Sequence, residues 1–325
     1  MNMRMKFIKF LLVVILIALP LSSASANMAA PFGFGSTIGN FITNPKDVLE
    51  VKEENIKFEI SGTLISADIT YKIVNSGEDA DFTIIFPALN PIMEDSNYAF
   101  KVRVFQKEIP YEAKNLYELM DLLKGNYEKV ENLTTFKDSI YFDPLTGEEY
   151  VPTKEYQYTG EPIEKRFFVF NIFLKKGVAT EVKVDFKSYA GFDSRRYQRL
   201  VYHYYYILNV KDFYKSFENV KISIIYPKTY PLKSNLEGTI SEVDDKKILT
   251  IILNENFNNL SFSYMEGRIS KIGISLYKSF PFLYGEALGF FLIFFVLPLV
   301  LIVGVGVIIY FLIIRKRKTR KRLKL

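Results

Sequence analysis

Three acidic residues between Asp143 and Tyr150 form the most conspicuous polar cluster of the chain. The carboxylates of Asp143, Glu148 and Glu149 are hard oxygen ligands of the kind that Ca²⁺ binds, so the segment is a candidate calcium site. The spacing lacks the alternating acidic pattern of an EF-hand loop. A tight turn, with Gly147 in the left-handed conformation, is the alternative explanation. Calcium is the one cofactor that these residues suggest.

The same carboxylates are poorly placed for glycoside hydrolysis, because adjacent residues on a strand point to opposite faces. The chain contains one histidine, His203, and no cysteine. This composition excludes disulfides, thiolate metal sites and mechanisms that need two imidazoles. No nucleophile-elbow pattern accompanies the histidine. We therefore predict that the protein is not an enzyme, and keep an extracellular hydrolase as an alternative.

Tyrosines surround His203 and are candidates for contact with a ligand or partner. Tyr202, Tyr204 and Tyr205 could stack on sugar rings or on a protein surface. The same aromatic run also suits a strand whose rings fill a core. Arg195 and Arg196 precede it in an expected loop, where they could bind an anionic envelope polymer or stay solvated.

The basic charge of the chain is concentrated at its two ends. The sequence has 42 Lys+Arg against 36 Asp+Glu, a formal net charge of +6. Eight basic residues lie in the segment 315–325, and the region 27–285 is more acidic than basic. Because phosphate contacts need Lys and Arg clustered on a folded surface, we expect no nucleic-acid partner.

Residues 1–26 are typical of a secretory signal peptide. Basic residues up to Lys9 are followed by an apolar stretch and a run of small residues. Ala24 and Ala26 occupy the positions of an A-x-A cleavage site, so we expect cleavage before Asn27. An uncleaved signal anchor is the alternative.

A second apolar segment, 286–314, carries no charge after Glu286. As a helix it would extend about 42 Å, enough to cross a hydrocarbon core of about 30 Å. We predict a single transmembrane helix, kinked at Pro298, rather than a buried core helix, which would be amphipathic. The basic tail 315–325 would then stay in the cytoplasm and contact anionic lipid, and a docking motif is its alternative role.

The region between the two apolar segments has the alternating pattern of β-strands. We predict a mainly β fold, an antiparallel β-sandwich exterior with two units at 27–130 and 164–266. The strands 168–174 and 180–186 are expected to pair as a hairpin. Residues 131–163 would form an irregular connection, and 267–285 a stalk that leads to the membrane.

One short helix is predicted at 115–124. Asn115 and Glu118 form a capping-box-like start, and Lys124-Gly125 is a plausible stop. Apolar residues recur at helical spacing, in Leu116, Leu119, Met120 and Leu123. We expect this stripe to pack on the first sandwich unit, with contact to a partner as the alternative.

Several segments of the chain together resemble a known group of proteins. They are the segments 26–31, 51–56, 67–75, 82–87, 204–208 and 220–227. The chain resembles a loose group of uncharacterised bacterial envelope proteins with a signal peptide, a β-rich exterior, one C-terminal span and a basic tail. The segment from Tyr71 to Pro87 is also similar to the inter-α-trypsin/vault β-domain. This resemblance implies no catalytic residues.

These observations favour a non-catalytic bacterial cell-surface protein, anchored in the cell membrane by one span. Residues 27–285 would be extracellular and act as a binding or scaffolding module for an envelope polymer or a membrane-protein partner. An accessory subunit of a membrane transport or secretion complex is a second hypothesis. A small-residue pair at Gly285 and Gly289, at the outer edge of the predicted span, is compatible with helix pairing.

Overall fold

The structure, a computed structural model, describes residues 32–33, 37–38, 42–44, 48–94, 97–123, 128, 130, 140–150, 164–193, 200–208, 210, 213–253, 258–267, 296, 298, 300–301, 303–307 and 310. The chain divides into two compact units, one of which comprises residues 30–194 and 199–269 and contains all the strands named below. The other unit comprises 1–29, 195–198 and 270–325, where residues 303–307 are helical.

The predicted signal peptide and basic tail lie outside the described residues, as does most of the predicted transmembrane segment. Within the described part of the chain, no helix combines the length and the apolar character needed to cross a membrane.

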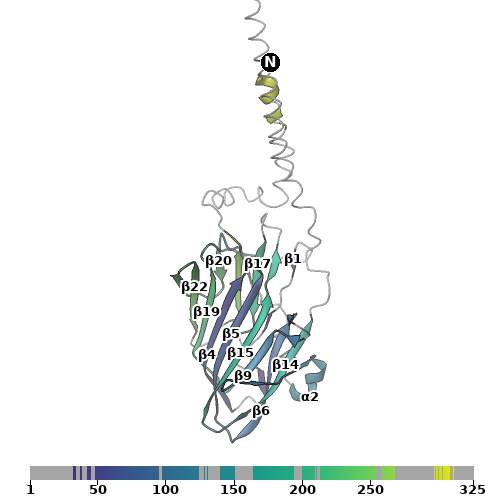
Figure 1. The fold of residues 1–325 in the computed structure, drawn as a ribbon, viewed down its shortest axis with the longest axis vertical. Helices are drawn as coiled ribbons and strands as arrows, with labels where there is room; N and C mark the ends of the chain where they lie inside the picture. The colour runs from purple at the N-terminus through teal and green to yellow at the C-terminus, as the bar shows by residue number, and fades with distance from the viewer. Residues whose placement is uncertain are drawn as a thin grey trace, which may run out of the picture. The chain divides into compact units, whose positions relative to one another are not determined.

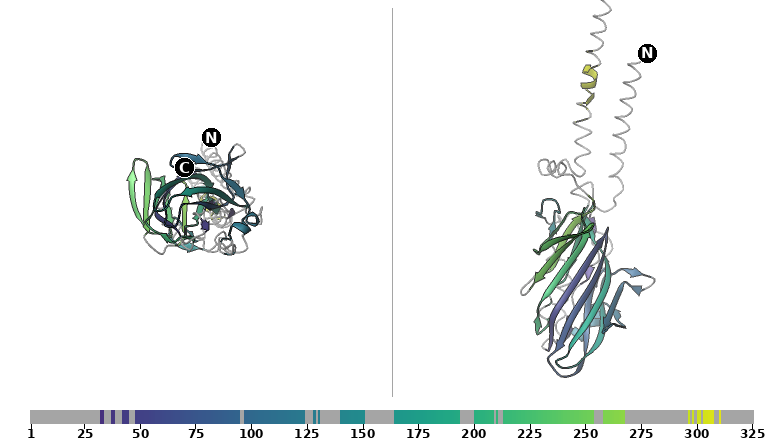
Figure 2. Two further views of the ribbon diagram at one scale, coloured as in Figure 1. Left: turned by 90° about the horizontal axis from the view of Figure 1, so that it is seen from below. Right: turned by 60° about the vertical axis from the view of Figure 1, so that its left-hand side comes forward.

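Nine of the described strands form one sheet, called here the large sheet. Its order is β10-β9-β15-β5-β4-β19-β22-β21, and β18 pairs with β4 off this path. Figure 1 and the right-hand view of Figure 2 show its long strands side by side. The strands are β4 (Leu49–Ser61), β5 (Leu64–Asn75), β9 (Phe100–Val104), β10 (Lys107–Ile109), β15 (Ala179–Tyr189), β18 (Ser216–Phe217), β19 (Val220–Pro227), β21 (Thr239–Val243) and β22 (Lys246–Leu253).

Two smaller sheets, each with five described strands, are named here after their central strands. The β17 sheet has the order β1-β16-β17-β23-β20, and the β6 sheet has the order β11-β14-β6-β2, with β3 also paired to β6. The first contains β1 (Phe32–Gly33), β16 (Gly191–Asp193), β17 (Val201–Tyr206), β20 (Leu232–Ser234) and β23 (Leu260–Met265). The second contains β2 (Thr37–Ile38), β3 (Ile42–Asn44), β6 (Ala80–Leu89), β11 (Glu112–Lys114) and β14 (Lys165–Leu174).

Two short ribbons complete the described strands. They pair β7 (Met93–Glu94) with β8 (Asn97–Tyr98), and β12 (Tyr141–Phe142) with β13 (Glu149–Tyr150).

A single apolar core joins the three sheets. The ring of Phe58 on β4 lies 5.5 Å from that of Tyr204 on β17 and makes an edge contact with it. The ring of Phe86 on β6 lies 6.1 Å from that of Phe186 on β15. The inner face of the large sheet therefore packs against both smaller sheets. Buried and solvent-accessible side chains alternate along its strands as the sequence predicts, and in β5 the buried positions recur at every second residue.

The predicted division into two β units differs from the structure. β15, from the second predicted unit, pairs along its length with β5 from the first. The predicted hairpin 168–174/180–186 is also wrong, because β14 pairs with β6 and β15 pairs with β5. The turn near Gly177, which has a φ of 68°, passes the chain from one sheet to the other.

The sequence predicts antiparallel pairing throughout, but the structure also contains parallel pairs. β19 and β18 both run parallel to β4. A parallel neighbour needs a long connection, and the chain between β4 and β18 passes through both smaller sheets before it returns.

The predicted helix is present, and its expected end at Lys124-Gly125 lies outside the described residues. It consists of the 3₁₀ turn η1 (Tyr117–Leu119) followed by α2 (Met120–Leu123). The capping box is confirmed: the Glu118 amide donates to Asn115 Oδ1 at 3.0 Å, and the Asn115 amide donates to Glu118 Oε2 at 2.6 Å. The apolar stripe joins the core except at Met120, which is exposed.

Candidate functional site: a charged trough on the large sheet

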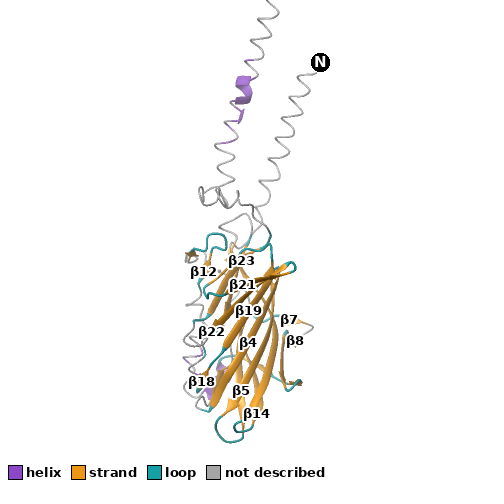
Figure 3. Ribbon diagram, turned by 90° about the vertical axis from the view of Figure 1, so that its left-hand side faces the viewer, coloured by secondary structure: helices purple, strands orange, loops and turns teal. Residues whose placement is uncertain are grey.

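The outer face of the large sheet carries a hollow with room of about 430 Å³, named here the charged trough. Its lining comes from four adjacent strands, β4, β5, β15 and β9, and from the segment that contains the β7–β8 ribbon. Figure 3 shows this ribbon beside the large sheet. The trough is open to solvent, so a ligand could reach it without any movement of the sheets.

One row of side chains crosses the trough from strand to strand. Lys57 on β4 is paired in register with Asp68 on β5, Asp68 with Asp185 on β15, and Asp185 with Lys101 on β9. These positions alternate with buried residues, so their side chains share the outer face. The order of charge along the row is positive, negative, negative, positive. Since neighbouring strands lie about 4.8 Å apart, the two lysines stand about 14 Å apart.

Five of the charged residues that line the trough already have partners. Arg103 forms an ion pair with Asp185 inside the row. Nζ of Lys187 lies 2.8 Å from a carboxylate oxygen of Glu94 on the β7–β8 ribbon. Nζ of Lys246 lies 2.5 Å from Glu59, and this hydrogen bond is the main reason why the pKa of Glu59 falls below its ordinary value.

Three charges of the row remain without an ion pair or hydrogen bond among the described residues. They are Lys57, Asp68 and Lys101, and all three are exposed. Two like charges, Asp68 and Asp185, stand directly opposite each other, an arrangement that disfavours the sheet. Lys57 faces Asp68 and Lys101 faces Asp185, so each lysine stands opposite a negative charge, which favours pairing of the strands. The row also leaves Lys57, Asp68 and Lys101 accessible to a ligand.

The tyrosines predicted for ligand contact lie in the interior instead. Tyr202, Tyr204 and Tyr205 are each at most 6 % exposed. The Tyr204 hydroxyl lies 3.0 Å from Oγ of Ser188, and the Tyr205 hydroxyl accepts a hydrogen bond from Asn259 at 2.6 Å. Burial is the main cause that raises the pKa of Tyr202 to about 12. β17 is buried on both faces, so its aromatic side chains fill the core rather than a binding surface.

His203 is also buried and packs against neighbouring side chains. Its Nδ1 lies 2.8 Å from Oγ of Ser263, and its ring meets that of Tyr141 edge-on at 4.8 Å. The two predicted loop cations, Arg195 and Arg196, lie outside the described residues.

The acidic segment at 143–150 forms the turn that was the alternative to a calcium site. The buried Asp143 carboxylate accepts hydrogen bonds from the amides of Leu145 at 2.9 Å and Thr146 at 3.1 Å. Gly147 has a φ of 77°. Glu148 and Glu149 are exposed, and in the described part of the chain no group of three acidic or histidine side chains is placed to hold a metal ion. Calcium binding by these residues stays a prediction.

A buried carboxylate, Glu54, is a residue that the sequence analysis missed. It is fully buried on the inner face of β4, where it is paired with Tyr71 on one side and Val220 on the other. The hydroxyls of Tyr71 and Tyr206 lie 3.5 Å apart, and burial followed by the negative charge of Glu54 raises the pKa of Tyr206 well above its ordinary value.

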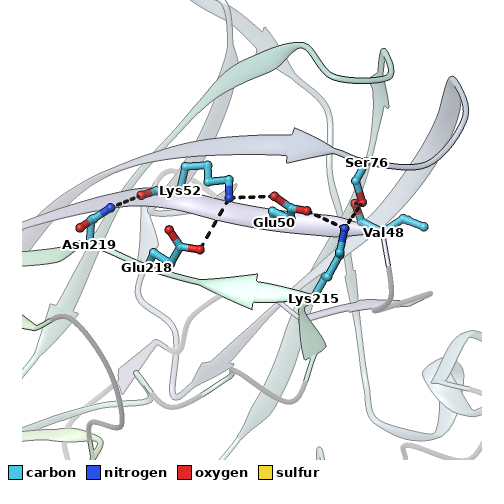
Figure 4. A network of polar contacts seen from close by, with 7 residues as sticks. All are labelled: Val48, Glu50, Lys52, Ser76, Lys215, Glu218 and Asn219. Carbon is cyan, nitrogen blue, oxygen red and sulfur yellow. Dashed lines mark hydrogen bonds and ion pairs between the residues drawn. The ribbon is translucent and has the colours of Figure 1, made fainter.

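A polar network at the start of β4 is shown in Figure 4. The Glu50 carboxylate lies 2.8 Å from Nζ of both Lys52 and Lys215, and Lys215 also donates to Ser76 at 3.1 Å. Asn219 donates to the Lys52 carbonyl at 3.0 Å. The network joins three segments that are far apart in sequence, so we interpret it as a structural joint.

The network predicts an acid-dependent contribution to stability. Hydrogen bonds from Lys215 and then Lys52 lower the pKa of Glu50 from 4.5 to about 2. A carboxylate whose pKa is lower in the folded than in the unfolded protein stabilises the fold fully at pH values above the unfolded pKa. This stabilisation is lost as the pH falls from about 4.5 to about 2. We expect Glu50→Gln to melt roughly 1–3 °C below the wild type at pH 6, because the two lysine partners of Glu50 are exposed and solvent screens their ion pairs.

The gap between Glu50→Gln and the wild type should close as the pH approaches 2, as measured by circular dichroism melts of the full-length protein. Glu78→Gln is the matched control, because Glu78 also pairs with a lysine, Lys176. Its side chain, however, is 87 % exposed. A gap that stays constant from pH 6 to pH 2 would contradict the role given to Glu50.

Comparisons with known proteins add information about the fold. No family model and no curated protein matches the chain. It is similar to a structure described as a "putative nutrient binding protein" from Legionella pneumophila, with 13% identity and a TM-score of 0.50, over 78% of this chain and 77% of that one. At that identity the match shows a shared fold.

Two longer structures match with lower TM-scores. The M1 zinc metallopeptidase from Deinococcus radiodurans has 9% identity and a TM-score of 0.29, over 68% of this chain and 43% of that one. Native yeast LTA4 hydrolase has 9% identity and a TM-score of 0.34, over 69% of this chain and 30% of that one. The chain thus spans less than half the length of either protein.

Proposed function

We propose that the protein is a non-catalytic binding or scaffolding module at the outer face of a bacterial membrane. In this proposal the β unit is a sandwich, with the large sheet as one layer and the two smaller sheets as the other. The charged trough is its binding surface. The observation that carries the proposal is that three members of the row, Lys57, Asp68 and Lys101, are exposed and have no ion pair among the described residues, whereas the other charges of the hollow are paired.

The sequence at the two ends supports the location. The apolar segment 286–314 would anchor the protein, and the basic tail 315–325 would lie against anionic lipid on the cytoplasmic side. A module held in this way would present the trough outside the cell, where an envelope component or the exterior of a membrane protein could reach it. The proposed function needs no cofactor.

The absence of cysteine from the chain allows a direct test of this topology. Two single-cysteine variants of the full-length protein, Ser66→Cys in the trough and Thr319→Cys in the tail, are treated with a membrane-impermeant maleimide in intact cells. We expect Ser66→Cys to be labelled in intact cells, and Thr319→Cys to be labelled only after lysis. A Ser66→Cys variant that is labelled only after lysis would contradict an exterior β unit, and labelling of Thr319→Cys in intact cells would contradict a cytoplasmic tail.

A further inference from the structure

We propose that the charged trough binds an extended peptide that runs across the strands and carries an acidic, a basic and an acidic residue at alternate positions. This inference rests on the proposed function and names the chemistry of the partner.

The charge order selects the partner's charges. Lys57 and Lys101 mark the two ends of the row, and Asp68 lies between them without an ion pair. Asp185, the fourth member, is neutralised by Arg103. A complementary ligand therefore places a carboxylate at each end and an amine in the middle. A uniform polyanion would meet the carboxylate of Asp68, and a uniform polycation would meet both lysines, so both are disfavoured.

The spacing fits an extended peptide. Three strand spacings of about 4.8 Å separate the two lysines, which gives about 14 Å. In an extended chain, side chains on one face recur every second residue, at about 6.8 Å, so two steps cover about 13.6 Å. Acidic residues at positions i and i+4 would then reach Lys57 and Lys101. A lysine or arginine at i+2 would lie above the middle of the row, within reach of Asp68.

The surrounding ion pairs define the place where this peptide binds. Next to the row, toward the β4–β5 turn, Glu59 and Lys187 stand in register on either side of Ser66. Their charges are already satisfied by Lys246 and Glu94. A ligand that moved toward that side would have to break these pairs, whereas Lys57, Asp68 and Lys101 have no ion pair to break among the described residues.

Two short peptides of the same residue types test the proposal. One is acetyl-TETKTET-amide, with the acid–base–acid order, and the other is the charge-inverted acetyl-TKTETKT-amide, each with a fluorescent label. Binding to the full-length protein in nanodiscs is followed by fluorescence anisotropy at low salt. We expect the wild type to bind the first peptide about tenfold more tightly than the second, because like charges placed together weaken binding.

A charge-swapped protein provides the decisive comparison. In Lys57→Glu/Asp68→Lys/Lys101→Glu the order of the free charges is inverted, and we expect the preference between the two peptides to invert with it. A milder variant, Lys57→Gln/Lys101→Gln, should lose the preference while it keeps the wild-type fold. Equal binding of both peptides to the wild type, or an unchanged preference in the swapped protein, would overturn the inference. If neither peptide binds while a cellular partner still occupies the trough, the peptide chemistry is wrong and the proposed function stands.

Discussion

Replacement of Phe58 by alanine is expected to lower the free energy of unfolding by about 3–5 kcal/mol, the usual cost of removing a buried phenylalanine ring. The Phe58 side chain is fully buried in the core. Its ring lies 5.4 Å from that of Tyr206 and 6.3 Å from that of Phe262, which belong to β17 and β23. The variant would therefore leave a cavity where the large sheet meets the β17 sheet.

Urea denaturation of the full-length protein in detergent measures this effect through tyrosine fluorescence, since the chain contains no tryptophan. Phe173→Ala is the matched control, because Phe173 is 55 % exposed on β14 and should cost under about 1 kcal/mol. A loss at Phe58 that is no larger than the loss at Phe173 would contradict the packing of these two sheets on one another.

The second large effect is expected in the trough and concerns binding rather than stability. Lys57→Glu/Lys101→Glu reverses both ends of the charged row, where neither lysine has an ion pair to lose. We expect the melting temperature to fall by only a few degrees, because each new glutamate faces an aspartate across the strands but all of these side chains are solvent-accessible. Cross-linking of the trough to its partner in cells should fall at least about tenfold, because the partner's charges would meet like charges.

A control pair of substitutions separates the trough from the general charge of the surface. Lys221→Glu on β19 and Lys233→Glu on β20 change the net charge equally at exposed positions outside the trough. Cross-linking in this control should match the wild type. An equal loss in both variants would show that the overall charge, and not the trough, governs the interaction.

The strands could be predicted from the sequence, whereas their partners could not. The alternation in β5 and β15 places Ile69 and Val184 on the inner face as expected. The same alternation looks identical whether two successive strands form a hairpin or enter different sheets. The turn at Gly177 separates β14 from β15 in space, and nothing in the period of the pattern distinguishes that turn from a hairpin turn.

The candidate site depends on register, which explains why the sequence analysis did not find it. Lys57, Asp68, Lys101 and Asp185 come from four strands, and they form a row only because of how those strands pair. The burial of Glu54 could have been predicted, because the alternate inward-facing positions Ile56 and Phe58 continue two residues back to Glu54. The run of tyrosines in β17 suggested a ligand-binding surface, but this strand is buried on both faces and has no exposed side.

The central claim is that the trough is the surface through which this protein binds its partner. The most direct measurement places a photo-cross-linking amino acid at Ser66, in the trough, and at Ser241, on the exposed edge strand β21, in full-length protein in living cells. We predict a defined adduct from Ser66 that is absent from Ser241 and absent when Lys57 and Lys101 are reversed. The same adducts from both positions, or an adduct at Ser66 that survives the reversal, would contradict the account.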